Sequence, residues 1–282
     1  MLKKTMKKWI NAAFVFLLAT KALAAVTTQD FIYAVYGTNS TQQALTVYHP
    51  DGWSSNDLRT CMVLFHGGGW TGGDKSQMYD VCNYFANRGL VTITANYRLN
   101  YTNDNYVNPT NPIYGVSIQT ICVQDAKTVL RWVKLNHALL GINTNIIISG
   151  GDSAGAHIST LSQIDYVHNN TNDLTTLSTR VKALVLFSPA FGNSSTEPEN
   201  VFSYYSATNR LPPVRFLCGE IDSWKGGSDQ LLVTMRKIGD DARFWQKKNQ
   251  GHNYWLGAQF EPHACVVTEQ FLKDIGLLTA DQ

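Results

Sequence analysis

Residues 151–155 read Gly-Asp-Ser-Ala-Gly and so match the spacing G-x-S-x-G. In this pattern a sharp turn between a strand and a helix exposes the serine hydroxyl as a nucleophile. An apolar run at 145–149 precedes the pattern and a helical segment at 154–166 follows it. The glycines allow close approach of neighbouring chain, and the start of the helix favours negative charge. We therefore predict that Ser153 is a nucleophile.

A glycine run lies upstream, at residues 66–70, where His-Gly-Gly-Gly-Trp follows an apolar strand candidate. Glycines at a strand end let backbone N–H groups turn inward, as is needed to stabilise a tetrahedral oxyanion. We assign this role to Gly68 and Gly69, with the N–H of Ala154 as the third donor. A phosphate-binding loop is the competing interpretation, but neither G-K-[ST] nor a dinucleotide-binding spacing follows the glycines.

A serine hydroxyl is a weak nucleophile at neutral pH, and it needs a general base that a carboxylate orients. Asp222 follows the strand candidate 215–218, and His252 follows the candidate 243–246. Both residues therefore lie beyond strand ends, at the same edge of the sheet as the serine. Their order along the chain is Ser, Asp, His, which is the order that G-x-S-x-G hydrolases use.

Three other residues compete for these two roles. Glu220 and Asp229 are alternative acids, and His263 is an alternative base. Glu220 is too close to its strand to reach across, while Asp229 and His263 fall within predicted helices. We therefore predict Asp222 as the acid and His252 as the base of an acyl-transfer reaction.

The elements that hold these residues alternate along the chain from residue 30 onward. Short runs rich in β-branched and aromatic residues alternate with amphipathic segments of helix length, which is typical of strands joined by crossover helices. We predict an α/β fold with a mostly parallel central sheet of about eight strands and helices on both faces. The strand candidates are 31–37, 44–49, 61–66, 91–97, 145–149, 183–188, 215–218 and 243–246, and the helix candidates are 77–87, 119–138, 154–166, 228–238 and 262–274.

Residues from about 60 to 275 resemble the carboxylesterases with HGGG and GDSAG motifs, a group that includes hormone-sensitive-lipase-like esterases and bacterial feruloyl and acetyl-xylan esterases. The matching stretches are HGGGW at 66–70, GDKS at 73–76, NYRL at 96–99, the helix with Asp125 and Trp132, and GDSAGAH at 151–157. The resemblance implies an α/β-hydrolase fold, a serine carboxylic ester hydrolase, and a structural role for Asp74 in holding the oxyanion loop. The sequence departs from the lipase-like branch after Asp222 and after residue 99, which favours the general esterase assignment.

Two long connections, 100–117 and 192–213, lack clear periodicity and carry aromatic residues. Long loops in a compact domain often act as lids or binding loops. Tyr106 and Tyr205, together with Trp70 and Trp224 beside the catalytic positions, are therefore candidate substrate-binding residues. The alternatives are incidental surface aromatics and, for the tryptophans, core packing.

The segment 25–60 is too short to build a helical cap as well as the first strands. We therefore expect an open pocket that prefers short acyl groups. Because tryptophan can stack on a sugar ring, short-chain or carbohydrate-linked carboxylic esters are the expected substrates.

Residues 1–24 combine a lysine-rich head, an apolar core of about a dozen residues and a small-x-small pattern at Ala22-Leu23-Ala24. We predict a signal peptide that is cleaved after residue 24, followed by a single domain at 25–282 that is secreted or periplasmic. An uncleaved anchor is the alternative, but the apolar core is shorter than the ~20 residues that a bilayer span needs. We expect no stable membrane anchor after cleavage.

Removal of residues 1–24 takes away five lysines and no acidic residue, so 23 basic and 21 acidic residues become 18 and 21. The remaining chain also holds no basic run or arginine-rich helix, so nothing in the sequence suggests nucleic acid or an anionic membrane as a partner. The sequence holds no C-x-x-C, H-x-x-H or H-E-x-x-H, so we expect neither a metal nor a cofactor. Export makes disulfides possible among the five cysteines, although the odd count leaves one thiol free or paired between chains.

Two other functions are weighed against ester hydrolysis. An exopeptidase or amidase of the same fold would use the same triad. A hydrolase-fold binding protein without activity would be expected to lack a triad or oxyanion residue, and here all of them are present. The oligomeric state is left open.

Overall fold

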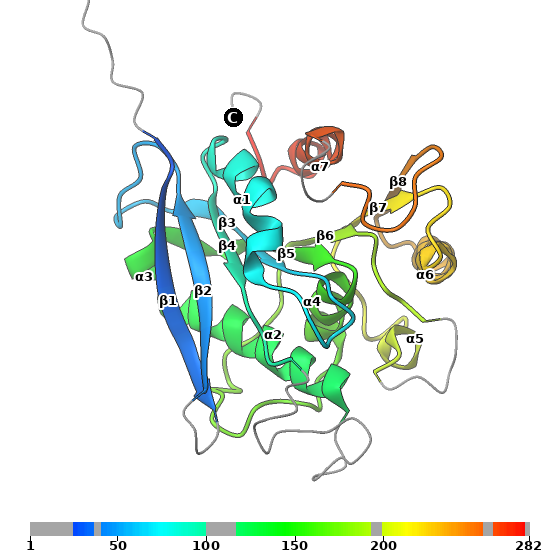
Figure 1. Ribbon diagram of the computed structural model, residues 1–282, viewed down its shortest axis with the longest axis horizontal. Helices are drawn as coiled ribbons and strands as arrows, with labels where there is room; N and C mark the ends of the chain where they lie inside the picture. Colours follow the sequence, from blue (N-terminus) through cyan, green and yellow to red (C-terminus); the bar gives the residue numbers. More distant parts are fainter. Residues whose placement is uncertain (1–24, 37–40, 100–116, 193–198, 256–261, 280–282) are drawn as a thin grey trace, which may run out of the picture.

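The computed structural model describes residues 25–36, 41–99, 117–192, 199–255 and 262–279. Within these residues one sheet of eight strands runs through the molecule in the order β1-β2-β4-β3-β5-β6-β7-β8 (Figure 1). The first two strands pair antiparallel, β2 is antiparallel to β4, and all other pairs are parallel. The strands are β1 Thr27–Tyr36, β2 Thr41–His49, β3 Arg59–Phe65, β4 Val91–Ala95, β5 Ile142–Asp152, β6 Ala183–Phe187, β7 Val214–Gly219 and β8 Ala242–Lys247. The predicted fold class is confirmed.

The five predicted helices are present, and the described part of the chain adds three further short helical segments. A segment of four residues is too short to show a helical period, which is why the sequence pattern did not reveal these three. The helices are η1 Lys75–Met78, α1 Tyr79–Ala86, α2 Ile118–Leu135, α3 His137–Leu140, α4 Ala154–Ile164, α5 Val201–Tyr204, α6 Lys225–Lys237 and α7 Pro262–Asp274.

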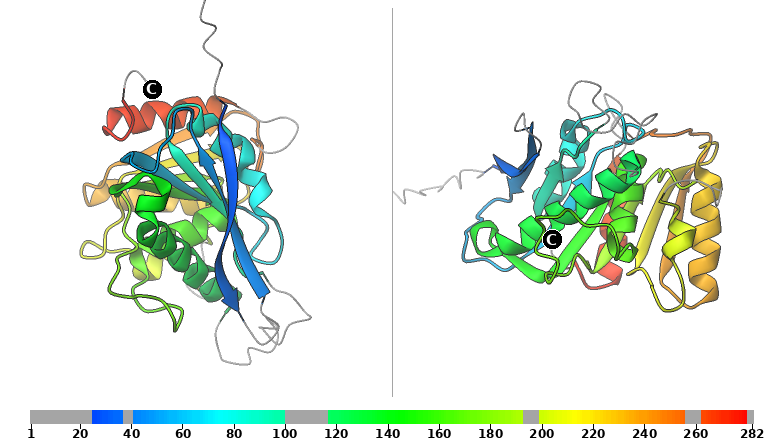
Figure 2. Two further views of the ribbon diagram at one scale, coloured as in Figure 1. Left: turned by 90° about the vertical axis from the view of Figure 1, so that its left-hand side faces the viewer. Right: turned by 90° about the horizontal axis from the view of Figure 1, so that it is seen from below.

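The helices cover both faces of the sheet. Apolar side chains of α2, α4 and α6 pack with one face in one core cluster, and those of α1 and α7 pack with the other face in a second cluster. Figure 2 shows α1 and α2 on opposite sides of the sheet. All residues of the central strands β4 and β6 are buried, as expected for parallel strands covered on both faces.

The five cysteines all lie in the described part of the chain, and each is a buried free thiol. The structure therefore contains none of the disulfides that export would permit. None of the described helices is long and apolar enough to cross a membrane. The predicted signal peptide lies outside the described residues.

Candidate active site

Ser153 stands on the turn between β5 and α4. Its backbone has φ 52° and ψ −116°, an unusual conformation for a residue with a side chain. The N–H of Ser153 donates to the carbonyl of Phe187 at the end of β6 (2.9 Å), which fixes the turn against the neighbouring strand. Gly155 is required for packing, because a Cβ atom there would lie 2.1 Å from the carbonyl oxygen of Phe65. The serine is thus lifted to the carboxyl edge of the sheet.

Three side chains from separate strand ends meet at this edge. His252 Nε2 lies 2.9 Å from Ser153 Oγ. On the other side of the ring, Nδ1 lies 2.9 and 3.0 Å from the two carboxylate oxygens of Asp222. The structure therefore brings together the three residues that the sequence singled out, in the geometry in which a base can take the serine proton while a carboxylate orients the ring.

Asp222 is almost fully buried but is held as a charged group. Burial acts to raise the pKa of this carboxyl, but hydrogen bonds from His252 and from the backbone N–H of Trp224 (2.8 Å) outweigh it and hold the pKa below its usual value. An ionised carboxylate at this position can stabilise an imidazolium on His252.

The rival residues have other partners. Glu220 Oε2 accepts from the backbone N–H of Asn249 (2.8 Å), and Asp229 pairs with Lys225 one helical turn away. His263 lies on the exposed side of α7. The structure therefore keeps all three out of the chain of contacts that ends on Ser153.

The glycine loop approaches the serine closely. A Cβ atom on Gly67 would lie 2.4 Å from Asp152 Oδ2 and 3.2 Å from Ser153 Cβ, so only glycine fits beside the nucleophile. The next two residues, Gly68 and Gly69, have φ values of 122° and 60°, which a side chain rarely permits. This loop carries two of the three amides that we predicted as oxyanion donors, and the third, on Ala154, begins α4.

Side chains behind the loop hold it in place. Asp74 accepts from the N–H of Ser76 (2.9 Å) and from Asn96 Nδ2 (3.0 Å), which agrees with the structural role that the resemblance implied. The Tyr97 hydroxyl donates to the His66 carbonyl (2.8 Å), and the two rings stack with centroids 4.3 Å apart. These contacts give a physical reason for the HGGGW, GDKS and NYRL stretches to occur together.

Sequence reasoning missed a second layer of residues around the triad. Asp152 is fully buried, and burial together with the charge of Asp222 raises its pKa well above the usual value. With its amide nitrogen turned toward that acid, Asn253 donates to Asp152 Oδ1 (2.9 Å). The backbone N–H of Asn253 also lies 3.4 Å from Ser188 Oγ. These contacts tie the loop that carries His252 to the nucleophile turn.

Several residues at and around the catalytic site have strained backbone conformations. Six described residues other than glycine have positive φ: Trp70, Ser153, Ser188, Glu199, Asn249 and Asn253. Such conformations persist only where the surrounding structure enforces them, and they cluster at functional sites. All but Asn249 belong to the catalytic edge or to the residues that support it. Ser188 comes directly after β6 and Asn253 directly after His252, and such positions are the signals that could have found these two residues.

The predicted substrate-binding residues separate into three cases. Trp70 and Trp224 lie edge to face with ring centroids 6.5 Å apart, and Trp224 directly follows the Asp222 turn. Tyr205 is 7% exposed and its hydroxyl donates to Asp240, so it packs in the core and is not part of the substrate rim. Tyr106 lies outside the described residues.

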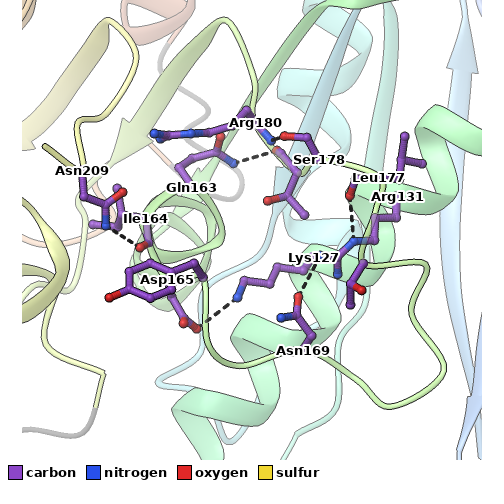
Figure 3. Close-up of a pocket in the computed structure, with 13 residues that line it drawn as sticks. Lys127, Arg131, Gln163, Ile164, Asp165, Asn169, Leu177, Ser178, Arg180 and Asn209 are labelled. Carbon is purple, nitrogen blue, oxygen red and sulfur yellow. Dashed lines mark hydrogen bonds and ion pairs between the residues drawn. The ribbon is translucent and has the colours of Figure 1, made fainter.

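A cavity of about 350 Å³ lies beside α2 and the carboxyl end of α4 (Figure 3). Its charged side chains already have partners: Lys127 lies 3.2 Å from Asp165, and Arg131 donates to the Leu177 carbonyl (3.0 Å). The 11 residues of α4 span about 16 Å. The cavity is therefore at the far end of this helix from Ser153 and is separate from the catalytic site.

Near this cavity Asp165, His168 and Glu199 bring possible metal ligands within 4.8 Å of one another. His168 Nδ1 lies 3.2 Å from an oxygen of each carboxylate. A cation would share this group with the side chain of Lys127, whose Nζ is 3.2 Å from the same Asp165 oxygen. We interpret the group as a network of polar contacts around the ion pair between Lys127 and Asp165.

Comparison with known proteins identifies the family. The BD-FAE family model matches residues 45–192, just over half of the chain. Among solved structures, Thermogutta terrifontis esterase 2 phosphoramylated by tabun is 26% identical, with a TM-score of 0.77 and coverage of 89% of this chain and 96% of that chain. The form phosphorylated by paraoxon is 25% identical, with a TM-score of 0.77 and coverage of 89% and 95%. No curated protein matches the chain.

The predicted resemblance and the predicted enzyme class are confirmed by these findings. The chain has the α/β-hydrolase fold and is a serine hydrolase of carboxylic esters. It belongs to the BD-FAE family.

Proposed function

We propose that the enzyme hydrolyses short-chain carboxylic esters through an acyl-enzyme on Ser153. The observation that carries this proposal is the continuous chain of contacts from Ser153 Oγ through both ring nitrogens of His252 to Asp222. A serine placed in this way needs no other activating group.

Each step of the reaction moves one proton through His252. Nε2 takes the proton of Ser153 Oγ as the oxygen attacks the ester carbonyl, and the imidazolium then gives it to the leaving alcohol. Water repeats the sequence in the second half: His252 removes its proton, the hydroxide oxygen attacks the acyl carbon, and Ser153 Oγ leaves with the proton. Asp222 keeps the ring oriented and balances its charge throughout.

The oxyanion of both tetrahedral intermediates would lie between the glycine loop and the start of α4. The amides of Gly68, Gly69 and Ala154 are the proposed donors, and loss of one such donor typically lowers kcat by about 10² to 10³. The positive φ values of both glycines support this assignment, because they turn successive peptide groups out of an extended path.

Short acyl groups are the proposed substrates. Thermogutta terrifontis esterase 2, at 24% identity, has been solved with propionate and with butyrate bound, which supports this proposal. Trp70 and Trp224 form an apolar corner between the glycine loop and the Asp222 turn, where a ring of the substrate, such as a sugar, can pack. A panel of acetyl, butyryl, octanoyl, feruloyl and acetyl-xylan esters tests this, and higher kcat/KM on octanoyl than on acetyl esters would contradict it.

Replacement of the nucleophile tests the reaction itself. Ser153→Ala should abolish hydrolysis of p-nitrophenyl acetate and labelling by a fluorophosphonate probe while the circular dichroism spectrum stays unchanged. Ser203→Ala, at an exposed serine of α5, is the matched control and should keep both. Wild-type rates in Ser153→Ala would overturn the mechanism, and cleavage of aminoacyl amides in preference to esters would assign the triad to an amidase or exopeptidase.

Export is a separate part of the proposal. The lysine-rich head, apolar core and Ala22-Leu23-Ala24 pattern support cleavage after residue 24 and release into the periplasm or medium. N-terminal sequencing of the protein made in an exporting host should begin at Ala25. An intact N-terminus on active enzyme in the cytoplasm would contradict export.

A further inference from the structure

His157 is a buried histidine that the catalytic reaction does not use. It lies in the first turn of α4, four residues after Ser153, and is 4% exposed. Trp70 Nε1 donates to His157 Nδ1 (3.3 Å), and His157 Nε2 lies 2.9 Å from the carbonyl oxygen of Glu199. The imidazole therefore bridges the glycine loop to the segment that enters α5.

The partners of this ring determine its protonation. An indole N–H only donates, so Nδ1 of His157 must accept, and Nε2 must carry the hydrogen that is donated to the Glu199 carbonyl. Burial lowers the pKa of His157 to about 4, so the ring is neutral at neutral pH. Only the neutral tautomer with its hydrogen on Nε2 satisfies both contacts.

Both ends of the bridge have backbone conformations that need support. Trp70 has φ 63° and Glu199 has φ 55°, and a bulky or charged side chain rarely adopts such values. Glu199 is held on α2, where the Thr120 hydroxyl donates to its carboxylate (2.6 Å). Glu199 is therefore anchored on α2, and Trp70 is the residue at the other end of the bridge.

Trp70 connects the ring of His157 to the catalytic edge. It follows Gly69 directly, and its ring meets His157 edge to face with centroids 5.2 Å apart. Its other neighbour is Trp224, whose backbone N–H donates to the carboxylate of Asp222. The indole therefore lies between His157 and the turn that carries Asp222, outside the contacts that join Ser153, His252 and Asp222.

We propose that His157 is a positioning residue that fixes the Trp70 indole against Trp224, and that this fixed corner is the subsite for a ring in the ester substrate. This inference rests on the proposed function and deepens it by naming His157 as the residue that positions the corner where a planar or cyclic group of the ester packs. Esters without a ring react at the same triad, but contact with the two tryptophans does not lower their KM.

Two pairs of substrates separate positioning from chemistry. Phenyl acetate is compared with ethyl acetate, and methyl cinnamate with methyl butyrate, so that a ring on either side of the ester is tested. In His157→Leu we expect KM to rise roughly 3- to 10-fold for the ring-bearing member of at least one pair, the equivalent of one hydrogen bond. The ratio of variant to wild-type KM should stay near one for the partner without a ring, and the loss should appear in KM rather than kcat.

Two further variants keep the test valid if His157→Leu folds poorly. His157→Gln retains one acceptor and one donor at similar reach, so it should recover part of the selectivity for rings. Trp70→Phe keeps an aromatic ring but removes the indole donor, and it should raise KM for the ring-bearing ester. Adding His157→Leu to Trp70→Phe should then change KM no further, because both changes remove the same contact.

The outcomes distinguish this inference from the proposed function. His137→Leu, at an exposed histidine of α3, is the control and should match the wild type on every ester. Equal loss on ring-bearing and ring-free esters, or additive effects of the two single changes, would overturn the positioning role while ester hydrolysis stands. Failure of the wild type to hydrolyse any of the four esters would instead overturn the proposed function.

Discussion

Replacement of Asp222 by asparagine is the sharpest test of the proposed triad. The change keeps the size of the side chain but removes the charge that faces His252 Nδ1 at 2.9 and 3.0 Å. An asparagine amide can also offer a donor to Nδ1 and so favour the tautomer that cannot accept the serine proton. We therefore expect the fold to persist and the reaction to slow.

The size of the effect follows from the geometry. With the carboxylate against one ring nitrogen, the two charges in the transition state are about 4 Å apart, and at an effective dielectric constant of about 20 they attract by about 4 kcal/mol. At about 1.4 kcal/mol for each factor of ten, this attraction is worth about 10³ in rate. The unfavourable tautomer adds to this loss, so we expect kcat to fall by about 10³ to 10⁴.

Steady-state hydrolysis of p-nitrophenyl acetate at pH 8 measures this loss, with urea unfolding as a check on stability. Asp229→Asn is the matched control, because this rival carboxylate is 45% exposed and pairs with Lys225 of its own helix. The control should stay within about twofold of the wild type. A loss below tenfold in Asp222→Asn, or a comparable loss in Asp229→Asn, would refute the assignment of the acid.

Three further predictions concern the loop, the core and pH. Gly67→Ala should lower kcat/KM by about 10²-fold, because the new Cβ atom would lie 2.4 Å from Asp152 Oδ2. Gly72→Ala is the control: its Cβ atom would have no neighbouring atom closer than 3.8 Å, so its kcat/KM should be close to that of the wild type. Asp125→Ala should lower the free energy of unfolding by about 3 kcal/mol, since it removes a fully buried partner of Arg98, and a urea titration showing less than 1 kcal/mol would contradict this. The pKa of His157 is lowered from 6.5 to about 4. Between pH 6.5 and pH 4 the folded state therefore binds fewer protons than the unfolded state, and the free energy of unfolding decreases as the pH falls through this range. From pH 7 to pH 5 the free energy of unfolding should fall by about 2 kcal/mol because of His157, and this fall should be absent in His157→Gln. If the variant has the same pH dependence as the wild type, the ring of His157 is not held neutral.

The five buried thiols bear on the proposed export. Each is an apolar core residue, and burial raises the pKa of Cys61, Cys82, Cys122, Cys218 and Cys265. A raised pKa keeps a thiol protonated, and burial keeps oxidants away from it. The fold can therefore tolerate an oxidising compartment without a disulfide.

Local patterns in the sequence were sufficient for much of the fold. The alternation of apolar strands and amphipathic helices predicted the eight-stranded α/β sheet, because a parallel strand covered on both faces must be apolar throughout. Strand ends also indicated where Ser153, Asp222 and His252 would meet, because parallel strands place their carboxyl ends at one edge. The short helices η1, α3 and α5 escaped prediction because four residues hold no period.

Only the tertiary structure decided which polar groups would be partners at that edge. The spacing of Trp70, His157 and Glu199 along the chain does not link them. They lie in a loop, in helix α4 and in a second loop, and only the packing of the sheet and its helices brings these three segments together. Tyr205 is a second example. Its place in a loop of aromatic residues suggested that it lines the substrate rim, but the fold buries it against Asp240. Sequence patterns record which residue types an element needs, whereas contacts between elements depend on how the whole sheet and its helices pack.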